Sequence, residues 1–428
     1  MLLSGLGLLG TLAVGWSVFR APAVAVALVV ASVPLQGFAV VGVGDGAITW
    51  TQAWLWTYLA VAATLFAARL IAVRVDLATL SFGIVVVCYI HSLRFMTDEV
   101  AWRNEVYRWA VTLAFFVSTR ALVGKRPFGG ALVGVAVLGA VWTTVVAVIQ
   151  MVLDVGPTSF ERAGRMRAYS AFGEPNTYGA FAAGSLVVLV ACPLFARPPQ
   201  PRWWRPGIAA GAAFSGAGLL LSQSRGALAA TVVVLGAMIA LKLNGSGCVS
   251  RPARLTAVAA VTVAVILAAP RVSARLARSG AVVEVTSASW ADQERLAHWG
   301  AASRMIVASD GIGVGAGQFD SRYREVTPTW RYRISQGHAH NAYLQVAAEA
   351  GLLGLGAYVA LLTAVLVSLA RRLARDGPSV GIVSACAATG VFALHNLVDY
   401  LHVLNLPIIL VAWWAVALGQ SKGPAKTP

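Results

Sequence analysis

The sequence predicts an all-α, polytopic membrane protein, and two observations support this prediction. Of the 428 residues, 58% are hydrophobic and only 12% are charged, whereas about 25% of residues are charged in an average soluble domain. The apolar residues also form long, repeated runs close to the roughly 20 residues that a helix needs to cross a bilayer. We therefore expect about 12–13 transmembrane helices.

The expected spans follow one another along nearly the whole chain. They cover residues 2–19, 21–43, 53–73, 77–93, 106–123, 128–153, 176–195, 207–222, 226–243, 255–270, 341–369, 379–396 and 404–420. Only Arg20 and Pro22 separate the first two, so twelve spans fit as well as thirteen. The first run lacks the basic start of a signal peptide and is interpreted as a span. We divide the chain into N-terminal helices (1–270), one large loop (271–340), C-terminal helices (341–420) and a cytoplasmic tail (421–428).

The distribution of charge predicts the orientation. One set of alternate loops is rich in arginine and lysine and nearly lacks acids, which is typical of cytoplasmic loops. The other set, together with the large loop, is expected outside. Its acidic residues include Asp98, Glu99, Glu105, Glu161 and Glu174. The formal charge of +16 thus belongs mostly to a cytoplasmic rim. Because no basic soluble domain is present, we expect no nucleic-acid partner.

Two outward segments carry clusters of arginine. The segment RAGRMRAYSAFGEPN (residues 162–176) offers five polar candidates: Arg162, Arg165, Arg167, Glu174 and Asn176. The segment LSQSRGAL places Arg225 at a short turn between two spans. Arginine recognises phosphate through a planar pair of N–H donors. A phosphate-containing ligand is therefore expected on the outward side, without a carboxylate cage or a Cys/His set for a metal.

The large loop contains a third cluster. Ser289 and Asp292 form a capping-box pattern that predicts the start of a helix. Apolar residues then recur near helical spacing, so this helix is expected to be amphipathic, with Arg295 and His298 on its polar face. The alternating glycines of residues 311–317 end it. They are not a dinucleotide fingerprint, because no buried strand precedes them.

The fourth cluster is GHAHNAYLQVAAEAGLLGLGAY, residues 337–358, which begins polar and becomes an apolar helix. Its first turn holds His338, His340 and Asn341. A helix N-terminus is electropositive and presents free N–H groups. The same field disfavours an imidazolium, so His340 is expected to remain neutral and able to accept a proton.

Several of these residues also have a plain structural interpretation. Asn341, Gln345 and Glu349 form one polar stripe, which is more typical of helix packing than of catalysis. Arg225 could contact lipid headgroups, and Arg295 could belong to a solvated helix face. Three further polar residues gather near the last outward turn and could line the same cavity: His395, Asp399 and His402.

Three of these segments, in this order around one outward loop, resemble the O-antigen ligase and polymerase superfamily. They read SQSRGAL, ERLAHWGAASRMIVASDGIGVGAGQF and HAHNAYLQVAAEAGLLGLGAY. FGEPNTYGAFAA fits the family's upstream segment, and the resemblance covers about residues 160–420. It implies a GT-C-like helical fold in the bacterial inner membrane, with the active site facing the periplasm. It also implies an undecaprenyl-diphosphate-linked glycan as donor, contact with membrane lipids, and no cofactor.

The resemblance also implies roles for particular residues. The family's S-x-S-R arginine matches Arg225, its R-x-x-x-W arginine matches Arg295, and the histidine of its H-N motif matches His340. The implied diphosphate-binding residues are Arg225, Arg295, Arg165 and Arg167. The implied catalytic residues are His340, as general base, and His338. The implied supporting residues are Asn341, Glu174 and Asn176.

We therefore expect an inverting, metal-independent ligase that transfers a glycan to a hydroxyl of lipid A-core. A polymerase, with a glycan repeat as acceptor, would use the same chemistry. A lipid-linked glycan transporter belongs to a different class, but its site is expected near the membrane midplane, often at inverted repeats, and no repeat is evident. A sensor or scaffold would have no use for the polar clusters.

Overall fold

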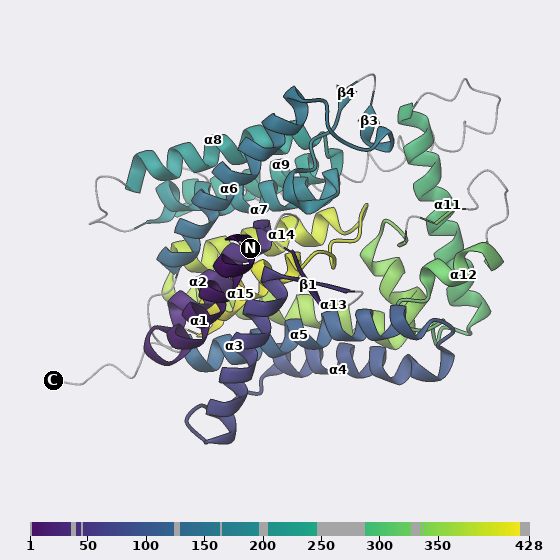
Figure 1. Cartoon of the computed structure of the whole chain (residues 1–428), viewed down its shortest axis with the longest axis horizontal. Coiled ribbons are helices and arrows are strands. Elements are labelled where there is room, and N and C mark those ends of the chain that lie inside the picture. The colour runs from purple at the N-terminus through teal and green to yellow at the C-terminus, as the bar shows by residue number, and fades with distance from the viewer. Residues whose placement is uncertain are drawn as a thin grey trace.

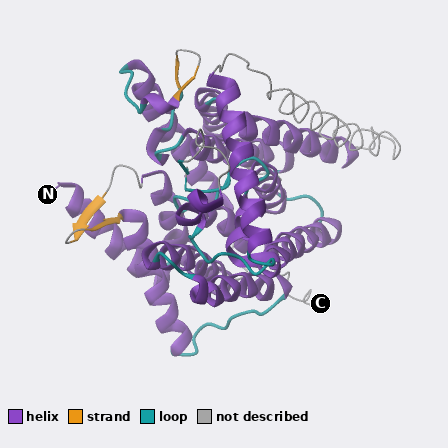
Figure 2. Cartoon of the chain, turned by 90° about the vertical axis from the view of Figure 1, so that its right-hand side faces the viewer, coloured by secondary structure: helices purple, strands orange, loops and turns teal. Residues whose placement is uncertain are grey.

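The computed structural model describes residues 2–35, 40–43, 46–123, 129–162, 165–196, 204–245, 287–326, 334–335 and 337–419, and the structural statements below concern these residues. The chain forms a bundle of α-helices with two short β-hairpins at its rim (Figures 1 and 2). The first half contains α1 (Leu2–Arg20), α2 (Pro22–Ser32), α3 (Trp50–Ala67), α4 (Leu77–His91), α5 (Glu99–Val123), α6 (Gly129–Val152) and α7 (Pro175–Phe195).

The second half completes the bundle. It contains α8 (Trp204–Ser222), α9 (Arg225–Gly245), α11 (Ser287–Ala308), α12 (Phe319–Val326), α13 (Ala342–Asp376), α14 (Val380–His395) and α15 (Leu406–Gly419). The hairpins pair β1 (Val40–Val43) with β2 (Gly46–Thr49), and β3 (Glu161–Arg162) with β4 (Arg165–Met166).

Within the described ranges, six helices are long and apolar enough to cross a membrane, namely α4, α5, α6, α7, α9 and α13. Shorter apolar helices occupy Pro22–Leu35, Val380–His395 and Leu406–Gly419. The prediction of an all-α, multi-pass membrane protein is confirmed. The number of 12–13 spans and the domain boundaries stay predictions, and the expected span at 255–270 lies outside the described residues.

Two expected boundaries are wrong, for identifiable reasons. The span expected at 21–43 ends earlier, because α2 stops at Ser32 and the valine-rich stretch after it includes strand β1, which suits β-branched side chains. Helix α5 begins at Glu99, where Asp98 accepts a hydrogen bond from Ala101 N (2.9 Å). Glu105, expected in an outward loop, therefore lies inside this helix.

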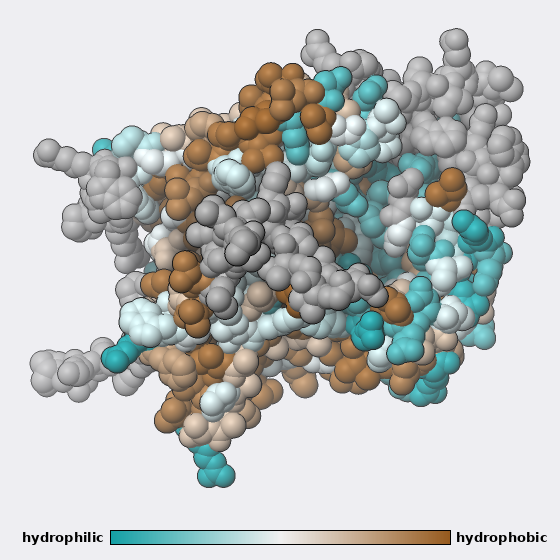
Figure 3. Space-filling view, in the orientation of Figure 1, coloured by the Kyte–Doolittle hydropathy of each residue, from teal (hydrophilic) through white to brown (hydrophobic). Residues whose placement is uncertain are grey.

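Helices α11 and α12 lie together at one end of the bundle, which is the hydrophilic end of the face in Figure 3. The glycine-rich segment after α11 docks against α13 at a break in that helix, where Gly351 has φ +74°. Leu352 N donates to Gly311 O (2.8 Å), and Val314 N donates to Ala348 O (2.8 Å). The alternating glycines thus allow the backbone of this segment to approach that of α13, and these hydrogen bonds attach the large loop to a membrane helix.

Gly313 is the position where this docking tolerates a side chain least. Its φ is +97°, and an added Cβ would lie 2.6 Å from Glu349 O. We expect Gly313→Ala to lower the free energy of unfolding by at least about 1–3 kcal/mol, the usual cost of such a backbone conformation. Thermal unfolding in detergent measures this. Gly216→Ala, where a Cβ meets nothing within 4 Å, should be tolerated, and equal losses in both variants would contradict the packing argument.

Candidate functional site

The first turn of α13 is fixed by Asn341, which caps the helix. Its Oδ1 accepts hydrogen bonds from Tyr343 N and Leu344 N, both at 3.0 Å. Its Nδ2 donates to Leu397 O (2.9 Å) in the turn that links α14 to α15. One side chain therefore satisfies exposed helix N–H groups and ties the mouth of α13 to that turn, which is a structural role.

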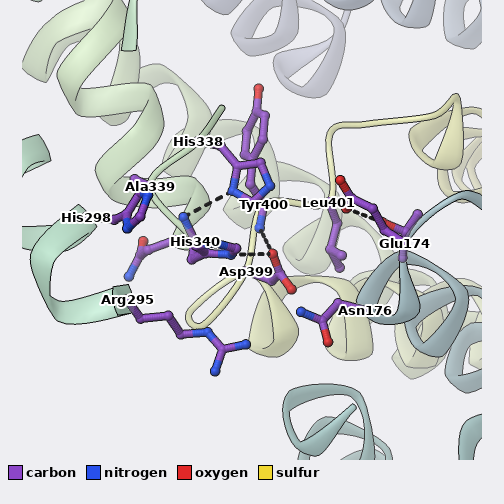
Figure 4. Close-up of polar contacts among 12 residues, drawn as sticks. Glu174, Asn176, Arg295, His298, His338, Ala339, His340, Asp399, Tyr400 and Leu401 are labelled. Carbon is purple, nitrogen blue, oxygen red and sulfur yellow. Dashed lines mark hydrogen bonds and ion pairs between the residues drawn. The ribbon is translucent and has the colours of Figure 1, made fainter. Parts of the chain in front are cut away.

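His340 faces Asp399 from this mouth (Figure 4). Its backbone is left-handed, with φ +48°, a conformation that non-glycine residues adopt mainly where the surroundings enforce it. His340 Nδ1 lies 3.3 Å from Asp399 Oδ1, and Tyr400 N donates to the same oxygen at 2.9 Å. The Asp399 side chain is only 5% exposed.

The charge state of Asp399 decides the tautomer of His340. Burial raises the pKa of Asp399, but the hydrogen bond and charge of His340 outweigh burial, so that pKa lies well below its usual range. An ionised carboxylate can only accept hydrogen bonds. His340 must then donate to it through Nδ1–H, so that in the neutral tautomer the lone pair lies on Nε2.

His338 has a different environment although it lies two residues away. It is buried, and its Nδ1 accepts a hydrogen bond from His340 N (3.2 Å). Burial lowers the pKa of His338 to about 3. The ring is therefore neutral at physiological pH, and the lone pair on Nδ1 already has a donor. Of the two histidines, His340 has the geometry of a base.

Asp292 of helix α11 pairs with two arginines, Arg225 of α9 and Arg295 of α11 itself. Arg225 contacts Asp292 Oδ1 at 2.6 Å, and Arg295 lies 3.6 Å from the same oxygen. The Arg225 side chain is 52% exposed and that of Arg295 25%, so both can reach a ligand. Trp299 Nε1 donates to His340 O (3.2 Å), which joins the arginine-bearing helix to the histidine segment.

The capping pattern in this helix was interpreted wrongly. Helix α11 begins at Ser287, before Ser289, and the carboxylate of Asp292 serves the two arginines. His298, expected on a polar face, is buried against Tyr323, with ring centroids 4.7 Å apart. Burial lowers the pKa of His298 to about 4. Of the two residues expected on the polar face, His298 is therefore packed inside the loop, whereas Arg295 stays partly exposed.

Arg167 and Asn176 bind each other. Arg167 NH2 donates to Asn176 Oδ1 (2.7 Å), and its Nε donates to Ser222 O (3.1 Å). The pair therefore joins the start of α7 to the α8–α9 turn that carries Arg225. Arg165 lies in β4, but its side chain is outside the described part of the chain, so its expected role stays a prediction.

Glu174 lies at the start of α7, near Asp399 and His340 (Figure 4). Its Oε2 accepts a hydrogen bond from the Thr177 hydroxyl (3.3 Å). Partial burial raises the pKa of Glu174, and the nearby negative charge of Asp399 raises it further. This carboxyl can therefore hold a proton more readily than an ordinary surface glutamate.

The polar stripe on α13 has a structural role. Gln345 Oε1 accepts from Ala339 N (2.7 Å), and Gln345 Nε2 donates to Glu349 Oε1 (2.9 Å). The same glutamate oxygen accepts from Phe319 N (3.2 Å) at the start of α12. This chain of hydrogen bonds fixes the backbone between His338 and His340, as the packing interpretation implied.

Of the three residues near the turn between α14 and α15, His395 lies beside Asp399 and His402 does not. His395 is buried, and its Nε2 lies 4.0 Å from Asp399 Oδ2 and 3.5 Å from Ser224 Oγ. It links the carboxylate to the turn that bears Arg225. His402 instead stacks on Trp109, with ring centroids 4.3 Å apart. Contacts of this kind join residues far apart in sequence, so spacing gives no signal for them.

A cavity lined mainly by apolar side chains lies between the helices. Leu401, two residues after Asp399, forms part of its wall. The remaining walls come from α2, α6, α7, α14 and α15, with Phe181, Phe392 and Trp413 as the aromatic members. The wall of this apolar cavity therefore includes one residue of the turn that carries Asp399.

His338, His340 and Asp399 also deserve testing as metal ligands. They offer one ligand atom each, all within 4.8 Å of one another. However, His340 Nδ1 pairs with Asp399, and His338 Nδ1 is occupied by His340 N. A metal ion would have to replace the first of these contacts, which orients His340. We interpret the cluster as a hydrogen-bonded one.

The fold and this cluster define a multi-pass, α-helical membrane protein whose polar side chains gather at one site. Residues 210–359 match a family model described as O-antigen ligase. This stretch includes Arg225, Arg295 and His340, whereas Asp399 lies beyond it. This stretch of the chain is therefore similar to the O-antigen ligase family. No curated protein matches the chain.

If the histidine cluster is held by hydrogen bonds alone, the purified protein should contain far less than one equivalent of Zn²⁺ or Mn²⁺. Elemental analysis measures this directly. Chelation should leave the thermal unfolding temperature unchanged, because a ligand bound only to the folded state would otherwise raise it. A stoichiometric metal that His340→Ala removes would instead establish a metal site.

Proposed function

We propose that this protein is an O-antigen ligase-type glycosyltransferase, which moves a glycan from undecaprenyl diphosphate to an acceptor hydroxyl. The family match supports a membrane glycosyltransferase in general terms. The observation that carries the proposal is the His340–Asp399 pair, which lies next to the helix that brings Arg225 and Arg295 together. A base and a diphosphate-binding pair are the two parts that this transfer requires.

In the proposed reaction His340 Nε2 takes the proton of the acceptor hydroxyl while its oxygen attacks the anomeric carbon. The bond from that carbon to the diphosphate oxygen breaks, and the configuration inverts in this single displacement. Asp399 holds the ring and stabilises the imidazolium that forms. Arg225 and Arg295 stabilise the charge on the departing diphosphate, in the way that fixed donors stabilise a developing anion. No metal takes part in these steps.

The apolar cavity supports a lipid-linked donor. In such a donor the isoprenoid chain begins only two phosphates away from the reacting carbon, so the chain must leave the site at once. Leu401 places the cavity wall two residues from Asp399. The polyprenyl chain would follow the cavity between α7 and α14, while the diphosphate stays at the arginines.

The acceptor and the compartment are also part of the proposal. We propose the bacterial inner membrane, with the site on the periplasmic face, because arginine-rich, acid-poor loops lie at the opposite ends of the helices. Lipid A-core is the proposed acceptor. A glycan repeat, as in a polymerase, would use the same residues. A transporter has no need for a histidine oriented by a carboxylate.

Replacing His340 tests the base directly. His340→Ala should reduce glycan transfer by purified protein in detergent by about 10²–10⁴-fold, the usual contribution of a general base. Binding of the lipid-linked donor should remain, because the arginines are intact. His338→Ala should cost less, since His338 only supports the backbone of His340.

Three outcomes of this experiment bear on the proposal. Wild-type protein that moves the donor across a bilayer but yields no product would identify a transporter. Loss of activity in His338→Ala with activity kept in His340→Ala would show that the wrong histidine was chosen. If both variants kept activity, general-base catalysis by this segment would be refuted.

The arginine pair is tested by conservative substitution. Arg225→Lys and Arg295→Lys should each lower kcat/KM by on the order of 10²–10³-fold, because lysine keeps the charge but lacks the planar fork. Transfer rates at several donor concentrations measure this. Arg322→Lys is the matched control, since Arg322 pairs with Glu325 on α12 away from the site. Full activity in Arg225→Ala, with normal expression, would remove that residue from the site.

A further inference from the structure

Helix α5 carries a buried acidic residue for which the proposed reaction has no use. Glu105 lies within the candidate span Glu99–Val123 and is only 2% exposed. A carboxylate inside a membrane helix is costly and normally has both partners and a function. The segment around it lies outside the stretch that matches the ligase family.

Three donors surround the Glu105 carboxylate. Its Oε1 accepts hydrogen bonds from the Tyr400 hydroxyl (2.6 Å) and from Trp109 Nε1 (2.9 Å). Its Oε2 forms an ion pair with Arg108. Two of these donors belong to α5 itself, so the contact to Tyr400 is the one that reaches another part of the chain.

Tyr400 connects this carboxylate to Asp399. The Tyr400 ring is buried, and its backbone N donates to Asp399 Oδ1, the oxygen that faces His340 Nδ1. The other oxygen, Asp399 Oδ2, is buried and has no hydrogen-bond donor within the described residues. Apart from His395 Nε2, which lies 4.0 Å from Oδ2, the contacts that orient the carboxylate are made to Oδ1, so a shift of the Tyr400 backbone would turn it.

The same segment of α5 also contacts His402, two residues after Tyr400. The His402 ring stacks on Trp109, and Arg108 NH1 donates to His402 O (3.4 Å). Residues 399–402 are therefore clamped against α5 at two points, through Glu105 and through Trp109. A buried ion pair is weak evidence for stability, whereas a clamp of this kind fixes orientation.

We propose that Glu105 and Tyr400 are positioning residues that set Asp399 against His340. This inference rests on the proposed function, because it assumes that the His340–Asp399 pair performs the proton transfer. Neither residue is required to touch the substrate. Helix α5 would thus contribute to catalysis from a region in which the sequence shows no family motif.

Tyr400→Phe removes only the hydroxyl and keeps the ring. We expect kcat for glycan transfer to fall roughly tenfold, with KM for the donor within about twofold, because an interaction that matters in the transition state has been weakened. Thermal unfolding should stay close to wild type. Tyr58→Phe is the matched control, because it removes another buried hydroxyl, which contacts Thr119 of α5 at 3.0 Å, and should leave kcat unchanged.

A double-mutant cycle separates positioning from a general loss of structure. If Tyr400 acts through Asp399, Tyr400→Phe should cause no further loss in an Asp399→Asn background, since contacting residues are not additive. Single-turnover assays with labelled donor provide the sensitivity. An undiminished tenfold loss in that background would overturn the proposal.

Substitutions of Glu105 keep the test decisive if Tyr400→Phe folds poorly. Glu105→Gln retains a carbonyl oxygen that can accept from Tyr400 and should keep most of the activity. Glu105→Leu should lose as much as Tyr400→Phe, and equal activity in the two Glu105 variants would contradict the inference. If His340→Ala and Asp399→Asn remain active, the proposed function fails. If they are inactive while Tyr400→Phe equals wild type, only the positioning role fails.

Discussion

The hydrogen bond between His340 and Asp399 joins the two parts of the chain on which the site depends. It connects the mouth of α13 to the turn between α14 and α15, and each partner is held by its own neighbours. Asn341 ties the same two segments together through Leu397 O. Helix α11 reaches this junction through Trp299. Arg225, Arg295 and His340 are neighbours because these segments meet at one point.

Much of the fold follows from simple features of the sequence. Hydrophobic runs of bilayer length indicate most of the helices, since a membrane helix must satisfy its own backbone. The residues most informative about the site are those at helix ends. There the free backbone groups give a side chain a function that it would not have in the middle of a helix. His340 and Arg225 are of this kind, and the structure brings their segments together through α11. The glycines of the loop were interpreted as loop geometry, which agrees with their close backbone contacts.

The remaining features could not be derived from the sequence, for a physical reason. Asp399 is part of the site because it contacts His340, which lies 59 positions away in the sequence. Local residue spacing does not indicate such a pair. Glu105 looked like a loop acid because its surroundings are polar, yet helix α5 extends past it. Asp292 fitted a capping pattern, but the nearby arginines compete for its carboxylate. Tertiary context prevails over local pattern in each case.

The break at Gly351 divides α13 into two parts with separate tasks. Residues 352–376 extend for about 38 Å at 1.5 Å per residue, which exceeds the roughly 30 Å of a bilayer's hydrocarbon core. The portion before the break is not needed for crossing the membrane. Gln345 and Glu349, which resemble intramembrane polar groups in the sequence, lie in that portion. The part of α13 before the break therefore serves to hold the hydrogen-bonded cluster of His338, His340 and Asn341 beyond the segment that is long enough to cross the bilayer.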